Sequence, residues 1–201
     1  MFKNSLLLTL IITLLCSIES CSNDNSGKPK IAKTVPFKYV INYDSGFANV
    51  QDTIYYQNKR FSGIQFALYP NGDTAFVKPC YEGLEEGISK QWYENKQLAE
   101  ERFYIAGKKE GVHKGWWPDG KLKFSYEFND GEFNGTVKEW YNNGRIFKTF
   151  HFINGHEEGS QKMWWINGKT RSNYEIRNGR RYGLLGTKNC VNVADSVRIM
   201  P

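Results

Sequence analysis

Histidine is scarce in this chain, and the motifs of the common enzyme classes are missing. The three histidines, His113, His151 and His156, belong to neither an HExxH nor a CxxC motif. No G-x-S-x-G motif, P-loop or dinucleotide fingerprint occurs in the 201 residues. The sequence therefore predicts no metal, no cofactor and no enzymatic activity.

Neither sign of charge dominates, and long apolar runs are missing. The net charge is +6, from 27 Lys and Arg against 21 Asp and Glu. This mild excess permits an acidic partner, and we expect no binding of nucleic acid. The ten-residue apolar run at 6–15 is too short to span a bilayer of about 30 Å as a helix.

The N-terminus has the pattern of an export signal. Lys3 precedes the apolar run, which is typical of a secretory signal peptide. "SIESC", residues 17–21, resembles a bacterial lipoprotein signal, in which cleavage precedes an acylated cysteine. Ser20 is small, as that cleavage requires, whereas Glu19 departs from the usual pattern. An ordinary secreted protein in which Cys21 is incidental remains the alternative.

The resemblance implies an organisation for the N-terminal part. Residues 1–20 would be the signal peptide, and residues 21–34 a flexible tether anchored by lipid at Cys21. This would place the protein in the bacterial cell envelope, outside the inner membrane. Ser22, in place of Asp, favours onward sorting to an outer membrane and leaves open which side it faces.

The strongest signal in the sequence is a repeat of 24 residues. A leading glycine recurs at this step without an insertion, and a second glycine series keeps the same step. Two large side chains follow each full leading position, and a turn signal such as Asn-Gly comes next. The leading glycines are Gly63, Gly87, Gly111, Gly135, Gly159 and Gly183; the second series is Gly83, Gly107, Gly131, Gly155 and Gly179.

Each unit is predicted to be a β-hairpin. Asn143-Gly144 and its equivalents favour a two-residue type I′ turn, which requires positive φ at both residues. About seven residues flank each side of the turn, the usual length of a strand. Because one hairpin is marginally stable alone, each unit must bury its apolar face against its neighbours.

The joint pattern of aromatic pair, Asn-Gly turn and closing glycine resembles the MORN repeat, in its bacterial variant form. The resemblance covers residues 63–186, with Lys96 departing from the turn glycine. It implies an all-β protein, an elongated antiparallel meander of hairpins in a single-layer twisted sheet. Residues 35–62 would supply N-terminal strands that cap the array, and residues 187–201 a C-terminal tail.

Alternation along the strands predicts two different faces. A two-residue turn would place Trp117 opposite Leu122 and Gly111 opposite Phe128. We expect Phe124 and its same-face neighbours to form the buried side, with a ring covering the backbone at each leading glycine. The further members expected there are Tyr126, Tyr141, Ile146, Phe150 and Phe152.

The opposite face is predicted to carry parallel ladders of indoles and amines, with Lys123 and Arg171 as cross-strand neighbours. The first interpretation is that lysine stems cover tryptophan rings in cation–π contacts. The second is that the ladders bind a partner. The candidate binding residues are Trp92, Trp116, Trp140, Trp164, Lys90, Lys114, Lys138 and Lys162.

Two further features are explained by the repeat geometry. About nine strand steps of ~4.8 Å separate Cys80 from the end of the array, and the tail reaching Cys190 spans too little to close that distance. We therefore predict that these two thiols are unpaired within the chain. The acidic pairs 85–86 and 157–158 fall between hairpins, where we expect solvated turns.

These observations favour a non-enzymatic, lipid-anchored scaffold that binds a protein partner outside the inner membrane. Three alternatives stay open. The lysine ladder suits the anionic phospholipids that MORN arrays are associated with, and the tryptophan ladder suits glycans. Proteins with this repeat variant also often carry an antitoxin label, although the export signal disfavours an intracellular toxin as partner.

Overall fold

The computed structural model describes residues 30–186, and every regular element in this range is a β-strand. The N-terminal strands are β1 (Tyr39–Ile41), β2 (Phe47–Val50), β3 (Thr53–Tyr56) and β4 (Lys59–Arg60). The repeat region begins with β5 (Gly63–Leu68), β6 (Thr74–Tyr81), β7 (Leu84–Glu85), β8 (Gly87–Trp92), β9 (Leu98–Ile105) and β10 (Lys108–Lys109). It continues with β11 (Gly111–Trp116), β12 (Leu122–Asn129), β13 (Glu132–Trp140), β14 (Ile146–Ile153), β15 (His156–Glu157), β16 (Gly159–Trp164), β17 (Thr170–Arg177) and β18 (Arg180–Leu184).

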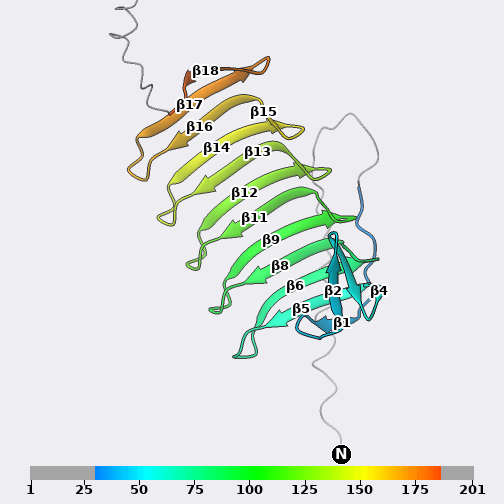
Figure 1. The fold of residues 1–201 in the computed structure, drawn as a ribbon. Helices are drawn as coiled ribbons and strands as arrows, with labels where there is room; N and C mark the ends of the chain where they lie inside the picture. Colours follow the sequence, from blue (N-terminus) through cyan, green and yellow to red (C-terminus); the bar gives the residue numbers. More distant parts are fainter. Residues whose placement is uncertain (1–29, 187–201) are drawn as a thin grey trace, which may run out of the picture. The chain divides into compact units, whose positions relative to one another are not determined.

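The repeats are hairpins that lie side by side in one open sheet (Figure 1). From β5 to β18 the long strands follow one another in chain order and pair antiparallel, with the two-residue strands β7, β10 and β15 beside this path, which confirms the predicted meander. Strand β1 pairs in parallel with the outer edge of β5, so the whole sheet is mixed. Strands β2, β3 and β4 form a separate small sheet.

The turn after each aromatic pair differs from the predicted type I′ turn. In the third full unit the N–H of Gly120 donates to the carbonyl of Trp117 at 2.8 Å, closing a β-turn over 117–120. The φ of Gly120 is +85°, whereas Asp119 keeps a negative φ and accepts the N–H of Lys121 on its carboxylate at 3.1 Å. The Asx side chain therefore caps a β-turn that a left-handed glycine completes.

This longer loop shifts the strand register beside the turn by one residue. Trp116, and not Trp117 as predicted, lies opposite Leu122. A β-bulge between Gly115 and Trp116 restores the register, so that Gly111 pairs with Phe128 as predicted. The two irregularities compensate each other over most of the hairpin.

True two-residue turns occur at the second glycine series, at the other end of the hairpins. Asn154 and Gly155 have φ values of +48° and +79°, and Ile153 pairs with His156 across them. Ala106 and Gly107 repeat this geometry, with φ values of +50° and +78°. Two-residue turns of the predicted kind therefore occur, but at the second glycine series and not after the aromatic pairs.

These turns are tied to the preceding repeat by hydrogen bonds at a fixed spacing. The N–H groups of Gly107, Gly131 and Gly155 each donate to a carbonyl 22 residues earlier, at 2.8–2.9 Å. The residue before the leading glycine accepts the N–H of the turn 20 residues later, as Glu86 does from Ala106 at 2.6 Å. The same contact recurs from Glu82 to Ser62, from Asp130 to Glu110 and from Asn154 to Asn134.

This role of Glu86 overturns the prediction that the acidic pair 85–86 lies in a solvated turn. Glu86 is 1% exposed and also accepts the N–H of Lys33 at 2.7 Å, and Glu85 is half-buried in β7. The carboxylate of Glu86 supplies the acceptor for the turn N–H of Ala106.

At three of the four junctions between hairpins in the described residues the strands pair through only two residue pairs, and at two of these a side chain bridges the gap. Strands β9 and β11 pair through only two residue pairs, which leaves a gap beside Phe103, whose carbonyl also accepts the N–H of Glu110 at 2.9 Å. His113, the second residue after its leading glycine, places Nε2 2.8 Å from the carbonyl oxygen and 3.2 Å from the nitrogen of Phe103. At the equivalent position Gln161 accepts the N–H of His151 at 3.2 Å and donates to its carbonyl at 2.8 Å.

The predicted buried face is confirmed at its centre. Phe124, Phe128 and Phe150 are 6%, 7% and 9% exposed, whereas Leu122 at the turn is exposed. Rings pack against rings along the strands, with Phe124 stacked on Tyr126 at 4.5 Å between centroids.

Leading glycines are needed for their φ, +66° at Gly111, and a Cβ there would meet a ring only at 3.9 Å. The expected covering of glycine by a ring is therefore not the reason for that series.

The small sheet β2-β3-β4 packs on the first hairpins, in front of β6 and β8 in Figure 1. Ile54 and Phe61 from this region cluster with Val40 and Cys80. Cys80 is a fully buried free thiol, and burial raises its pKa to about 12. Its predicted lack of a disulfide agrees with this environment, while Cys190 lies outside the described residues.

The bridging position generates a prediction about stability. One imidazole nitrogen can serve only one of the two backbone groups of Phe103, whereas a carboxamide serves both. We expect His113→Gln to raise the free energy of unfolding by about 1 kcal/mol at pH 7. Chemical denaturation monitored by fluorescence would measure it, with Gln161→His as the matched reciprocal change that lowers stability.

The same comparison has a pH dependence of known sign. Burial lowers the pKa of His113 below its ordinary value of 6.5. Below pH 6.5 the imidazole therefore binds a proton more readily in the unfolded chain than in the folded chain. The free energy of unfolding decreases as the pH is lowered. The advantage of His113→Gln should grow as the pH drops from about 7 to about 5. A difference that stays constant or shrinks over that range would contradict the buried, neutral imidazole.

Candidate functional site

The predicted lysine ladder is a continuous row across the sheet. In the strand register Lys114 pairs with Glu101 and Ser125, and Lys138 pairs with Ser125 and Thr149. The row then passes through Lys162 and Asn173, and on the other side of Glu101 it reaches Lys90. Lysines thus occupy every second strand, about 10 Å apart.

The charges along this row are unequally compensated. Lys90 forms an ion pair with Glu101 at 3.1 Å. Lys114, Lys138 and Lys162 are exposed, and no ion pair with them occurs within residues 30–186. The residues between these three are the hydroxyls Ser125 and Thr149. The row therefore presents three ammonium groups and neutral hydrogen-bonding side chains, which suits an anionic partner.

The predicted tryptophan ladder lies two residues beyond the lysines on each strand, so it shares their face. All four indoles are half-buried. Their backbone carbonyls accept hydrogen bonds from the second aromatic of the preceding unit: Tyr93 donates to Trp116 at 2.9 Å, and Tyr141 to Trp164 at 2.9 Å. Tyr69 donates to Trp92 at 2.7 Å, and the indole of Trp117 to Trp140 at 3.3 Å. The aromatic pairs thus join neighbouring repeats and fix the position of this row.

The expected cation–π contacts between these ladders are not observed in the described part of the chain. The cations lie over other rings: Lys123 over Trp117 at 4.8 Å and Arg171 over Trp165 at 4.5 Å. The one-residue shift beside the turn brings Lys123 and Arg171 to the second aromatic, away from the predicted ladder. On the buried face Arg102 covers Phe124, Lys109 covers Phe128 and Lys148 covers Phe150, at 5.1–5.9 Å. Long cationic side chains thus shield the single-layer core.

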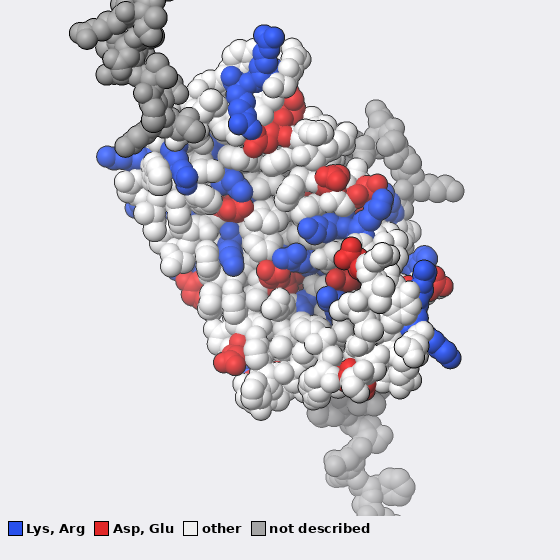
Figure 2. Space-filling model, viewed as in Figure 1, with Lys and Arg blue, Asp and Glu red and all other residues white. Residues whose placement is uncertain are grey.

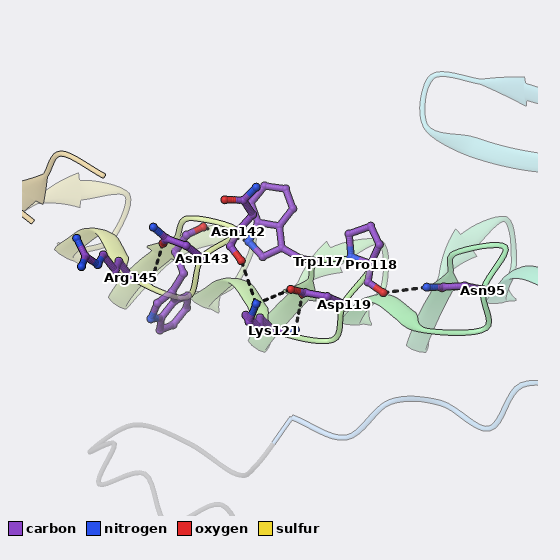
Figure 3. Close-up of polar contacts among 9 residues, drawn as sticks. Asn95, Trp117, Pro118, Asp119, Lys121, Asn142, Asn143 and Arg145 are labelled. Carbon is purple, nitrogen blue, oxygen red and sulfur yellow. Dashed lines mark hydrogen bonds and ion pairs between the residues drawn. The ribbon is translucent and has the colours of Figure 1, made fainter. Parts of the chain in front are cut away.

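The turns at the aromatic end form a polar edge of their own (Figure 3). The amide of Asn95 donates to the carbonyl of Pro118 at 2.8 Å, which joins two successive turns. Lys121 pairs with Asp119 at 2.7 Å, and its Nζ lies 3.5 Å from the carbonyl of Asn142 in the next turn. Most polar groups of this edge therefore hold repeats together, so it is a poor candidate for an independent binding site.

Two hollows that sequence reasoning missed lie along the sheet. One, of about 320 Å³, is lined by charged and polar residues between the first and second units. The other, of about 330 Å³, is lined mainly by rings between the third and fourth units, where Tyr126 donates to Glu139 at 2.8 Å. Burial and the neighbouring carboxylate raise the pKa of Tyr126, so its hydroxyl stays a donor. The strand positions of the lining residues could be predicted from the sequence. That side chains leave space unfilled at these two junctions could not be predicted.

Several predicted features lie outside these surfaces. Cys21, the signal peptide and most of the tether are outside the described residues, as is the C-terminal tail. Residues 30–186 contain no group of three or more His, Cys, Asp or Glu side chains placed to hold a metal ion. Within the same range no helix is long and apolar enough to cross a membrane.

Comparison with known proteins agrees with the repeat geometry. The family model described as MORN repeat variant matches residues 85–106, 109–130 and 133–154. Each match covers both strands of one hairpin and the turn between them, and ends one residue before the closing glycine. No curated protein sequence matches the chain. Repeats of this family are non-catalytic modules that generally bind proteins or membranes.

The 24-residue hairpins, their stacking contacts and three consecutive family matches lead to one assignment. Residues 85–154 form three successive repeats of the MORN repeat variant type.

Proposed function

We propose that this protein is a non-enzymatic, lipid-anchored scaffold of the bacterial cell envelope that binds an acidic protein. The binding surface is the face that carries the lysine row and the tryptophan row. The observation that supports it is the set of three exposed lysines without ion pairs, held at regular spacing by the sheet. Fixed cations of this kind favour fast association and selection by charge complementarity.

The tryptophans contribute apolar area beside these charges. Indoles held by a rigid strand lose little conformational freedom on binding, and tryptophan is enriched among the residues that carry binding energy. An acidic protein engages both rows, because its carboxylates meet the amines while its apolar side chains meet the indoles. An anionic lipid surface shares the charge chemistry, and its binding is an alternative outcome of the test below.

The binding test uses lysine variants, because replacing half-buried tryptophans would also disturb packing. We expect the triple variant Lys114→Gln, Lys138→Gln, Lys162→Gln to lose at least about tenfold in affinity for its envelope partner, and wild-type binding to weaken with salt. The matched control Lys59→Gln, Lys169→Gln, Arg180→Gln removes the same charge from exposed positions elsewhere. Pull-down from envelope extract identifies the partner, and titration with the purified partner gives the affinities.

Two results would contradict the proposal. Equal loss of affinity in both triple variants would indicate a general charge effect. Binding of the full chain to anionic vesicles, lost in the first triple variant, with no protein captured, would favour a lipid surface over a protein partner.

The anchor has a separate test. The lipoprotein-like signal at residues 17–21 supports acylation of Cys21, so Cys21→Ser should move the protein from the membrane fraction to the soluble fraction. Mass analysis of the mature N-terminus would identify the acyl group on Cys21 in the wild-type chain. An unmodified Cys21 in a protein that fractionates identically to the variant would exclude the anchor.

A further inference from the structure

Two junctions between repeats depart from the bridging pattern described above. At the fourth unit Val137 takes the bridging position and strands β12 and β13 stay paired, whereas at the second unit strands β6 and β8 pair through only two residue pairs. Where His113 and Gln161 fill the gap with large polar side chains, the second unit has Ser89.

The residue that Ser89 would serve, ten positions earlier, is Pro79, which has no backbone N–H. The carbonyl of Pro79 accepts the N–H of Glu86 at 3.0 Å, as the carbonyls at the two bridged junctions do from Glu110 and Glu158. No bridging acceptor is therefore required here, and the short side chain leaves space.

That space is the polar hollow of about 320 Å³ between the first and second units. This volume is at the small end of the range for ligand sites, roughly 300–1,000 Å³. The hollow is on the face of the sheet that carries the small sheet. Basic and acidic side chains are interspersed on this face (Figure 2). The lining side chains that the argument uses are Lys78, Glu85, Ser89, Glu100, Arg102 and Tyr104.

The charges around the hollow form two ion pairs on different strands. Lys78 lies 3.2 Å from Glu85, whose carboxylate also accepts the hydroxyl of Ser89 at 3.0 Å. Arg102 lies 2.6 Å from Glu100 on the same strand. All four charged side chains are 23–35% exposed, so they are partly removed from water yet open to a ligand.

This composition selects a ligand by its charge pattern. A ligand with a single charge would attract one member of each pair and repel the other, in surroundings less polar than water. A molecule that carries both an ammonium and a carboxylate complements both signs at once. The hydroxyls of Ser89 and Tyr104 add hydrogen-bonding groups for the same ligand.

We propose that this hollow binds a small zwitterion, a free α-amino acid or a dipeptide. The carboxylate of the ligand lies toward Lys78 and Arg102, and its ammonium lies toward Glu85 and Glu100. The charged side chains of the site lie on the opposite face from the lysine row, although Lys90 of that row also contributes to the lining, and the site does not depend on the proposed protein partner. It follows from a local exception to the repeat pattern, the kind of departure that often marks a functional site.

The test is a calorimetric titration of the full chain with glycine, L-alanine, L-glutamine, L-lysine and glycylglycine. We expect saturable binding of at least one zwitterion. N-acetyl-L-alanine amide, which lacks both charges, should bind at least about tenfold more weakly than the zwitterion that binds best. No saturable binding of any zwitterion up to about 10 mM, or equal binding of the neutral analogue, would overturn the proposal.

Ser89→Gln is the matched control, because Gln161 shows that the array accommodates glutamine at this position. The variant fills the hollow and should lose binding at least about tenfold while it keeps its cooperative unfolding. Unchanged affinity in this variant would place the ligand elsewhere. Should Ser89→Gln not fold, Glu100→Gln keeps the shape and removes one carboxylate, and undiminished affinity there would equally contradict the site.

Discussion

Hydrogen bonds between equivalent positions of successive repeats are the constraint on which this structure depends. An aromatic side chain in one hairpin donates to a carbonyl 23 residues later, and a turn glycine donates to a carbonyl 22 residues earlier. One set acts at each end of the hairpins, so a unit is fixed to its neighbour at both ends. Because strands of neighbouring hairpins share only two residue pairs at three of the four junctions, these terminal contacts determine where the next hairpin begins.

The single-layer sheet explains the chemistry of its two faces. Apart from the small N-terminal sheet, no second layer of described residues covers the rings, so Arg102, Lys109 and Lys148 lie over them. Cations on that face are used in packing and in ion pairs. On the opposite face Lys114, Lys138 and Lys162 alternate with hydroxyls and form no ion pair within residues 30–186. The face that needs no shielding is therefore the one that can offer unpaired charge to a partner.

The sequence predicted much of this fold because its information is periodic. Fixed 24-residue steps specify stacked hairpins, and alternation specifies that Phe124, Phe128 and Phe150 share the buried side. The turn types were harder to predict, because Asn143-Gly144 and Asn154-Gly155 are the same dipeptide in two different turns. Asn143 caps its turn by accepting the N–H of Arg145 at 3.0 Å, whereas Asn154 itself adopts a left-handed φ. The difference depends on neighbouring strands, which a local pattern does not contain.

The candidate site was predictable in part for the same reason. The lysine row follows from register alone, and the structure places its members on one line. The roles of His113, Ser89 and Glu86 were not predictable, because each is set by a backbone group that lies ten or more residues away in sequence. His113 resembles a reactive or metal-binding residue when read alone, and the gap beside Phe103 shows that it is a bridge.

The most direct test of this account removes one complete repeat. Excision of residues 135–158 deletes 24 residues and places the third unit beside the fifth. Each hydrogen bond that spans 22 or 23 residues then finds an equivalent donor or acceptor in the new neighbour. The account predicts a folded chain that unfolds cooperatively in denaturant, with a smaller dependence of its unfolding free energy on denaturant concentration. Excision of residues 135–146 breaks the period and should abolish cooperative unfolding. Failure of the full-repeat excision to fold, or equal stability of the half-repeat excision, would contradict the stacking contacts as the basis of the structure.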